Sequence, residues 1–428
     1  MLATLNALFS LFLSYGVLLM ANGLFSTLLG VRSRLEGFDP QVTGLIMGAY
    51  FAGLLGGALT GAHVVNRVGH IRCFAAAASV MSITALLHVI WVDPVAWALM
   101  RVVAGFSMAG MIMVTESWLN ARAANAVRGQ VLALYMITNY FCAGLGQFLL
   151  PLADPGEFYL FSLVSILLSL ALIPVLLTRS EAPTPVPPQK GGFKDVYAIA
   201  PLALIGAGCS GAVNAAFHGM GPVYATAVGL SNTQTSAFMA AAIFGGLLLQ
   251  WPMGYVSDRI DRRFLLGGAA LIVSAICTVF ALLTPEGGLA LFLLPAGYGA
   301  VAYTVYSICV AHANDRATTG QSVRVAGAML MSYGTGAAFG PVVAGASMSA
   351  LGPAGLFWQS ALVTGALGLY TIYRLLVRPE RPVNRPFVPM PAAQYTSKEL
   401  VDAVREDTTA RRDKATQKTA AERDSALR

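Results

Sequence analysis

Long apolar segments follow one another along the chain, and short polar breaks separate them. A transmembrane helix needs about 20 consecutive, mostly apolar residues. Reading for such segments between charged residues or Pro, Gly and Asn breaks predicts twelve of them. They cover residues 6–30, 42–64, 73–91, 95–118, 129–150, 157–177, 198–223, 234–256, 264–283, 289–311, 325–349 and 354–376. The pattern therefore predicts an all-α membrane protein with twelve transmembrane helices.

An internal repeat divides these segments into two sets of six. Residues 22–25 (Asn-Gly-Leu-Phe) in the first segment recur as residues 214–217 (Asn-Ala-Ala-Phe) in the seventh, 192 positions later. Met47 in the second segment recurs at the same offset as Met239 in the eighth, and similar matches join the fourth segment with the tenth. Because six spans return the chain to the same side, the repeat predicts two parallel six-helix halves, an arrangement that secondary transporters use.

Basic residues are distributed unevenly between the two sets of connections. If both termini are cytoplasmic, the inner connections and the tail hold 24 of the 27 Lys and Arg residues, so the positive-inside rule predicts this orientation. The predicted organisation is an N-terminal half (1–178), a Pro-rich cytoplasmic linker (179–197), a C-terminal half (198–376) and a charged tail (377–428). We expect the tail to be disordered.

The composition excludes several classes of protein. Only 11% of the 428 residues are charged, against about 25% in soluble proteins, which excludes a soluble enzyme. The net charge of +7 follows from the basic inner connections and so does not indicate a nucleic-acid partner. The five cysteines form no CxxC pair and the spans hold no paired carboxylates or activated nucleophile. We therefore expect no metal, no cofactor and no enzymatic activity.

Several motifs resemble those of the major facilitator superfamily. Residues 254–263 (Gly-Tyr-Val-Ser-Asp-Arg-Ile-Asp-Arg-Arg) look like its G-x-x-x-D-R/K-x-G-R-R/K loop, whereas the equivalent loop in the first half has Asn66 in place of the Asp. Residues 101–105 (Arg-Val-Val-Ala-Gly) are similar to its R-x-x-x-G element. Residues 116–119 (Glu-Ser-Trp-Leu) and 250–254 (Gln-Trp-Pro-Met-Gly) look like the YcaD-like bacterial branch. The resemblance implies the fold and a transport mechanism but no particular substrate.

The same resemblance assigns a gating role to charged loop residues. Asp258 could accept hydrogen bonds from backbone amides at a helix start and pair with an Arg across the interface between the halves, which would hold the inner gate shut. The predicted gating residues are Arg67, Asp258, Arg259 and Arg262. The alternative is that the arginines only anchor the topology.

Ionisable residues inside predicted spans are rare and are read as functional by default. Arg101 and Glu116 share the fourth span but lie about 22 Å apart along a helix, so they cannot pair. Arg101 is a candidate ligand for an anionic substrate group, a helper in proton release or a structural residue. Glu116 and His218 are candidate proton-coupling residues, although Glu116 could instead pair with Arg67 or Arg128.

Polar side chains in other spans complete the candidate substrate site. Asn22 and Asn214 occupy equivalent positions of the repeat, and an amide in an apolar environment requires a hydrogen-bond partner. Each should therefore face a cavity or a neighbouring helix. With Arg101 and His218, the predicted substrate contacts are Asn22, Asn139, Tyr140, Asn214, Gln250 and Tyr303, and the remaining candidates are Gln147, Tyr298 and Tyr306.

Together these features predict a monomeric secondary active transporter of a bacterial inner membrane. We expect it to move a small organic solute, neutral or anionic, through the lipid bilayer by alternating access with protons as the coupling ion. The alternatives are a multidrug or metabolite efflux pump, and a receptor or scaffold on a transporter fold that signals through its C-terminal tail.

Overall fold

Helices form all of the regular structure that the computed structural model describes. The described residues are 2–122, 128–177, 193–283, 288–317 and 322–377. The predicted tail lies outside them from residue 378 onward, and so does the predicted linker up to residue 192. The last five residues of that linker belong to a short helix, α7.

Each of the twelve predicted spans coincides with one long helix. The first half contains α1 (Leu2–Leu35), α2 (Pro40–Val68), α3 (His70–Ile90), α4 (Pro94–Arg122), α5 (Arg128–Gln147), the 3-10 turn η1 (Leu150–Leu152) and α6 (Tyr159–Leu176). The second contains α7 (Phe193–Ile199), α8 (Pro201–Ala227), α9 (Asn232–Ser257), α10 (Arg262–Leu283), α11 (Ala290–Arg316), α12 (Ser322–Leu351) and α13 (Gly355–Val377).

Ten of these helices are long and apolar enough to cross a membrane, and the bent pair α7–α8 would add an eleventh. The helix axis bends by 113° between the two members of that pair. Helix α12, in which nine of thirty residues are Gly or Ser, is not among the ten. The twelve crossings and the cytoplasmic position of both termini stay predictions.

Capping residues and glycines set several helix boundaries. Ser231 and Gln234 form a capping box at the start of α9, with side-chain to backbone distances of 2.9 and 3.3 Å. Asp39 caps α2, whose first residue is Pro40. Gly69, with φ of 93°, separates α2 from α3 in a conformation that disfavours other residues.

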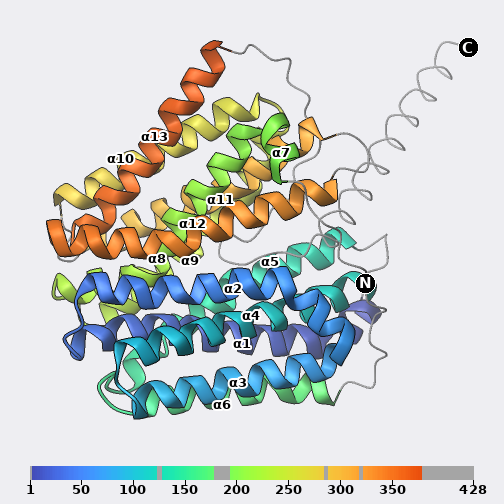
Figure 1. Ribbon diagram of the computed structural model, residues 1–428, viewed down its shortest axis with the longest axis vertical. Coiled ribbons are helices and arrows are strands. Elements are labelled where there is room, and N and C mark those ends of the chain that lie inside the picture. Colours follow the sequence, from blue (N-terminus) through green and yellow to red (C-terminus); the bar gives the residue numbers. More distant parts are fainter. Residues whose placement is uncertain (1, 123–127, 178–192, 284–287, 318–321, 378–428) are drawn as a thin grey trace, which may run out of the picture.

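The two halves lie side by side, and the three helix pairs with the most extensive contact between them are as follows (Figure 1). Helix α2 packs against α12, α5 against α9, and α1 against α8. The repeat maps α2 onto α9 and α5 onto α12, so the first two pairs are equivalent and the third pairs a helix with its own counterpart. The interface therefore has the approximate two-fold symmetry that two parallel halves require.

Glycines allow α2 and α12 to approach closely. A Cβ on Gly44 would lie 2.4 Å from the carbonyl oxygen of Pro341, and one on Gly345 would lie 2.4 Å from that of Pro40. Small residues permit this backbone-to-backbone packing in membrane helices. Because the contacts lie where α2 begins and α12 ends, they tie the halves together at that end of the molecule, which we call the closed end.

A carboxylate adds a polar contact at the closed end. Asp39 Oδ1 accepts hydrogen bonds from Ser349 Oγ at 2.6 Å and from the Gln41 amide at 2.7 Å. These bonds, the one from Ser349 first, hold the pKa of Asp39 below its ordinary value. The carboxylate contact is therefore complete above about pH 4 and is lost only as the pH falls through the lowered pKa.

Substituting Gly44 by Ala should weaken the closed end. The added Cβ would force the α2 and α12 backbones apart, and such overpacking costs about 1–3 kcal/mol. We expect a lower midpoint of thermal unfolding in detergent. Gly56→Ala on the same helix is the matched control, because a Cβ there meets no atom within 4 Å. Equal midpoints for the two variants would contradict the role of this packing.

Candidate functional site

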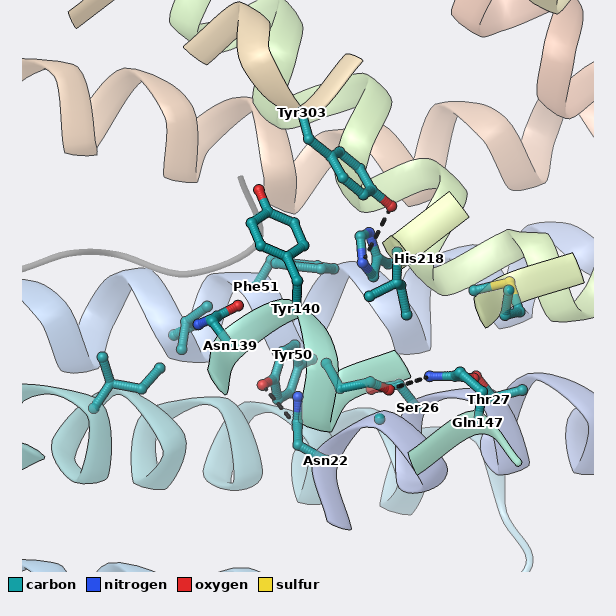
Figure 2. Close-up of a pocket in the computed structure, with 16 residues that line it drawn as sticks. Asn22, Ser26, Thr27, Tyr50, Phe51, Asn139, Tyr140, Gln147, His218 and Tyr303 are labelled. Carbon is teal, nitrogen blue, oxygen red and sulfur yellow. Dashed lines mark hydrogen bonds between the residues drawn. The ribbon is translucent and has the colours of Figure 1, made fainter. Parts of the chain in front are cut away.

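A cavity lies between the two halves. Helices α1, α2, α4 and α5 of the first half and α8, α9 and α11 of the second supply its walls (Figure 2). Its polar lining consists of Asn22, Ser26, Thr27, Tyr50, Asn139, Tyr140, Gln147, His218 and Tyr303. Among the described lining residues there is no Asp, Glu, Lys or Arg, so this surface is polar but uncharged apart from a titratable His.

One wall presents the faces of aromatic rings. Tyr140 on α5 and Tyr303 on α11 stack across the two halves, with ring centroids 6.2 Å apart. His218 on α8 stacks on Tyr303 with centroids 5.4 Å apart. Gln250 on α9 positions both tyrosines, because its Nε2 donates to Tyr140 Oη at 3.0 Å and to the Tyr303 carbonyl at 3.3 Å.

A hydrogen bond fixes the tautomer of the neutral His218 ring. Nδ1 lies 2.9 Å from the carbonyl oxygen of Asn214, which can only accept, so Nδ1 carries the proton. In the neutral ring Nε2 is then an acceptor, and it lies 3.4 Å from the Tyr303 hydroxyl (Figure 2). Protonation of Nε2 would convert this acceptor into a donor beside the cavity.

The opposite wall carries amide side chains from α1 and α5. Asn22 Oδ1 accepts a hydrogen bond from the Tyr50 hydroxyl at 3.0 Å, and Gln147 Oε1 accepts one from Thr27 Oγ1 at 2.5 Å (Figure 2). Asn139 Nδ2 donates to the Tyr15 hydroxyl at 2.7 Å. Each amide is thus held in one orientation by a neighbouring side chain, which leaves a defined set of donors and acceptors at the cavity surface.

Arg101 lies one side chain away from the cavity. It is only 1% exposed, and its guanidinium carbon sits 4.0 Å from the ring centroid of Tyr50 and 5.6 Å from that of Phe25. Its Nε and Nη1 have no hydrogen-bond partner among the described residues. A cation over an aromatic ring is stabilised by the ring quadrupole. The guanidinium therefore acts on the cavity through Tyr50, whose hydroxyl holds Asn22.

Glu116 is fully buried on α4, away from the cavity surface. Its Oε1 accepts a hydrogen bond from the Tyr135 hydroxyl at 2.6 Å. Of the two predicted basic partners, Arg67 is exposed at the end of α2, and the side chain of Arg128 lies outside the described residues. A tyrosine thus bonds this carboxylate.

The structure brings together five of the eight predicted substrate contacts. Asn22, Asn139, Tyr140, His218 and Tyr303 line the cavity. The other three support it from behind: Gln250 and Arg101 contact lining tyrosines, and the carbonyl of Asn214 holds His218. Gln147 also lines it, whereas Tyr298 donates to the Val213 carbonyl and Tyr306 packs on Tyr333.

Sequence reasoning did not find Ser26, Thr27 and Tyr50 as lining residues. Ser26 follows Asn22 by four positions, so helical periodicity places these two on one face of α1 and could have found Ser26. Tyr50 offers no such signal, since it stands among apolar residues of α2. No group of three or more His, Cys, Asp or Glu side chains within the described chain could hold a metal ion.

The ion pairs that the structure describes for the predicted gating loop lie within the second half. Arg262, only 2% exposed, donates to Asp315 on α11 at 2.8 Å and to Asp258 at 3.2 Å. The guanidinium of Arg259 stacks over the Tyr255 ring. Burial would raise the pKa of the neighbouring Asp261, but hydrogen bonds from Arg263 outweigh this effect and lower it. Arg262 therefore fastens the α9–α10 loop to α11.

The equivalent position of the first half uses a neutral contact. His70, 192 residues before Arg262, has its Nε2 3.0 Å from Ser117 Oγ on α4. Asn66 stands at the repeat position of Asp258. Among the described residues, the two halves thus hold equivalent loops with different chemistry, a neutral contact in the first half and ion pairs in the second.

Comparison with known proteins places the chain in a family. The model of the Major Facilitator Superfamily matches residues 9–328, so the chain belongs to the major facilitator superfamily and is a multi-pass membrane protein. This confirms the resemblance of the sequence motifs. The chain is similar to the uncharacterized MFS-type transporter YcaD of Escherichia fergusonii, at 27% identity over 328 residues, which cover 76% of this chain and 84% of that protein.

Solved structures share the fold at low sequence identity. A mutant of the nucleoside transporter NupG aligns with a TM-score of 0.74 and 13% identity, over 86% of this chain and 99% of that one. A D-xylose-proton symporter aligns with a TM-score of 0.62 and 13% identity, over 85% and 96% of the two chains.

Two of the buried arginines, Arg101 and Arg262, should differ in their contribution to stability. Arg101→Met removes a buried charge that has no described carboxylate partner, so we expect an unchanged or higher free energy of unfolding. Arg262→Met removes the cation between Asp258 and Asp315 and should lower that free energy by about 3 kcal/mol. Chemical denaturation in detergent measures both. Equal losses would contradict the distinction between a paired and an unpaired cation.

Proposed function

We propose that this protein is a secondary active transporter that moves a small, neutral, polar solute across a bacterial inner membrane by alternating access. The observation that carries the proposal is the cavity between two repeat-related halves, with polar and aromatic walls from both. A site built across two halves opens to one side of the membrane and then to the other when the halves rock against each other, which is how such transporters work.

The chemistry of the lining favours an uncharged solute with a ring. The stacked rings of Tyr140, Tyr303 and His218 offer flat faces, while the amides of Asn22 and Gln147 offer directed hydrogen bonds. Binding sites typically combine such apolar faces with a few placed polar groups. The structural relatives named for nucleosides and D-xylose carry solutes of this kind. Because Arg101 stands behind Tyr50, neutral solutes are favoured over anions.

Proton coupling would use the titratable groups in and behind the cavity. His218 lies in the lining with its Nε2 beside Tyr303, and Glu116 lies buried in the first half. Neither has a charged counterpart in the repeat, where Ser26 and Ile308 occupy the equivalent positions. An ionisable residue found in only one half points to a task beyond folding.

Uptake of labelled solutes into proteoliposomes tests the proposed function. Uridine, adenosine, D-xylose and L-fucose are the neutral probes, and D-glucuronate is the anionic one. We expect uptake of at least one neutral probe, increased by an inward proton gradient. Tyr303→Ala should reduce that uptake about tenfold by removing a stacking face, whereas Tyr373→Ala on the exposed surface of α13 should not. Uptake equal to that of empty liposomes for every neutral probe would refute the proposal.

The gating loop is tested separately. Asp258→Asn should insert and fold normally but slow uptake severalfold, because the neutral amide binds Arg262 less strongly than the carboxylate does. Asp195→Asn is the matched control, since Asp195 forms only an exposed pair with Arg324 at 3.7 Å. If both variants transport at the wild-type rate, Asp258 has no gating role.

A further inference from the structure

Three buried hydrogen bonds in series join the cavity wall to Glu116. Asn139 Nδ2 donates to the Tyr15 hydroxyl at 2.7 Å, Tyr15 donates to the Tyr135 hydroxyl at 3.0 Å, and Tyr135 donates to Glu116 Oε1 at 2.6 Å. The two tyrosine rings also stack, with centroids 5.0 Å apart. Tyr15, Tyr135 and Glu116 are fully buried and Asn139 is 3% exposed. This hydrogen-bond chain therefore runs through the protein interior, from the cavity lining to the Glu116 carboxylate.

Every bond in this chain points the same way. A carboxylate can only accept, so Tyr135 must donate to it, Tyr15 must donate to Tyr135, and Tyr15 must accept from the Asn139 amide nitrogen. A carboxyl group protonated on Oε1, the oxygen that faces Tyr135, would instead donate through its O–H. Tyr135 would then donate to Tyr15, and Tyr15 would donate to an acceptor on Asn139. Only the amide oxygen of Asn139 can accept, so its side chain would have to turn over.

We infer that protonation of Glu116 reverses the direction of this hydrogen-bond chain and turns over the Asn139 amide, which changes the group that Asn139 presents to the cavity. The proton comes from solvent and ends on a carboxylate oxygen, and the tyrosine hydroxyls only rotate. Tyr15 and Tyr135 are therefore positioning residues. The inference rests on the proposed function, to which it adds a route between the proton and the solute.

Glu116 is the group whose protonation the reversal requires. Besides Tyr15 on α1 and Tyr135 on α5, the titratable side chains that the structure describes beside this hydrogen-bond chain include Cys142, which neighbours Tyr15, and His70 at the start of α3. His70 contacts Ser117 and stacks on Trp118, with ring centroids 6.4 Å apart. A buried, cooperative hydrogen-bond chain with tyrosines in the middle transmits a change at one end to the other.

Infrared difference spectra of the purified full chain, taken between high and low pH, test the inference without any solute. We expect the C=O band of a protonated carboxyl group, which Glu116→Gln removes. We also expect a shift of an Asn side-chain amide band, which Asn139→Leu removes. Tyr135→Phe should keep the carboxyl band and abolish the amide shift, because it has no hydroxyl to carry the reversal.

Tyr224→Phe is the matched control. Tyr224 is buried, and its hydroxyl has no partner among the described residues, so both signals should persist. If Tyr135→Phe does not fold, Tyr15→Phe breaks the chain at the next bond and carries the same expectation. An amide shift that survives these substitutions, or a wild-type spectrum without the Glu116 band, overturns the inference. Failure of solute uptake with both signals present would refute the transport proposal and leave the switch intact.

Discussion

A polar group inside an apolar membrane core must bond to another group of the protein or face a water-filled space. This constraint accounts for where the amides of the cavity and Glu116 lie. The amides of Asn22 and Gln147 line a cavity and are held by Tyr50 and Thr27. Glu116 is placed against Tyr135 rather than in the lining. The cavity and its supporting bonds are thus two consequences of one requirement.

The repeat supplies symmetric packing, but the chemistry is divided between the halves. Helix pairs α2–α12 and α5–α9 are equivalent, whereas Arg101 and Glu116 correspond to Leu293 and Ile308 in the second half. The second half contributes the His218 and Tyr303 rings and the charged loop clasp. A solute between the halves would meet amides whose orientation the first half controls and ring faces that the second half supplies.

The apolar pattern was enough to predict the long helices, because hydropathy is a local property of the sequence. The division into two halves stays a prediction of the 192-residue offset. Five of the eight predicted substrate contacts line the cavity. They could be predicted because polar residues are conspicuous in apolar helices. The hydrogen-bond partners of these side chains could not be predicted from the sequence. Tyr15 meets Tyr135 across 120 residues, and tyrosines in an apolar helix carry no mark that separates packing from bonding.

Distance changes at the two ends of the molecule test alternating access most directly. Spin labels at Leu35 and Leu351 report on the closed end, and labels at Arg67 and Arg324 report on the opposite end, all at exposed positions in a variant without native cysteines. As pH is varied or uridine is added in liposomes, the account predicts that conditions lengthening the first distance shorten the second. Distances that stay fixed, or that lengthen together, would contradict it.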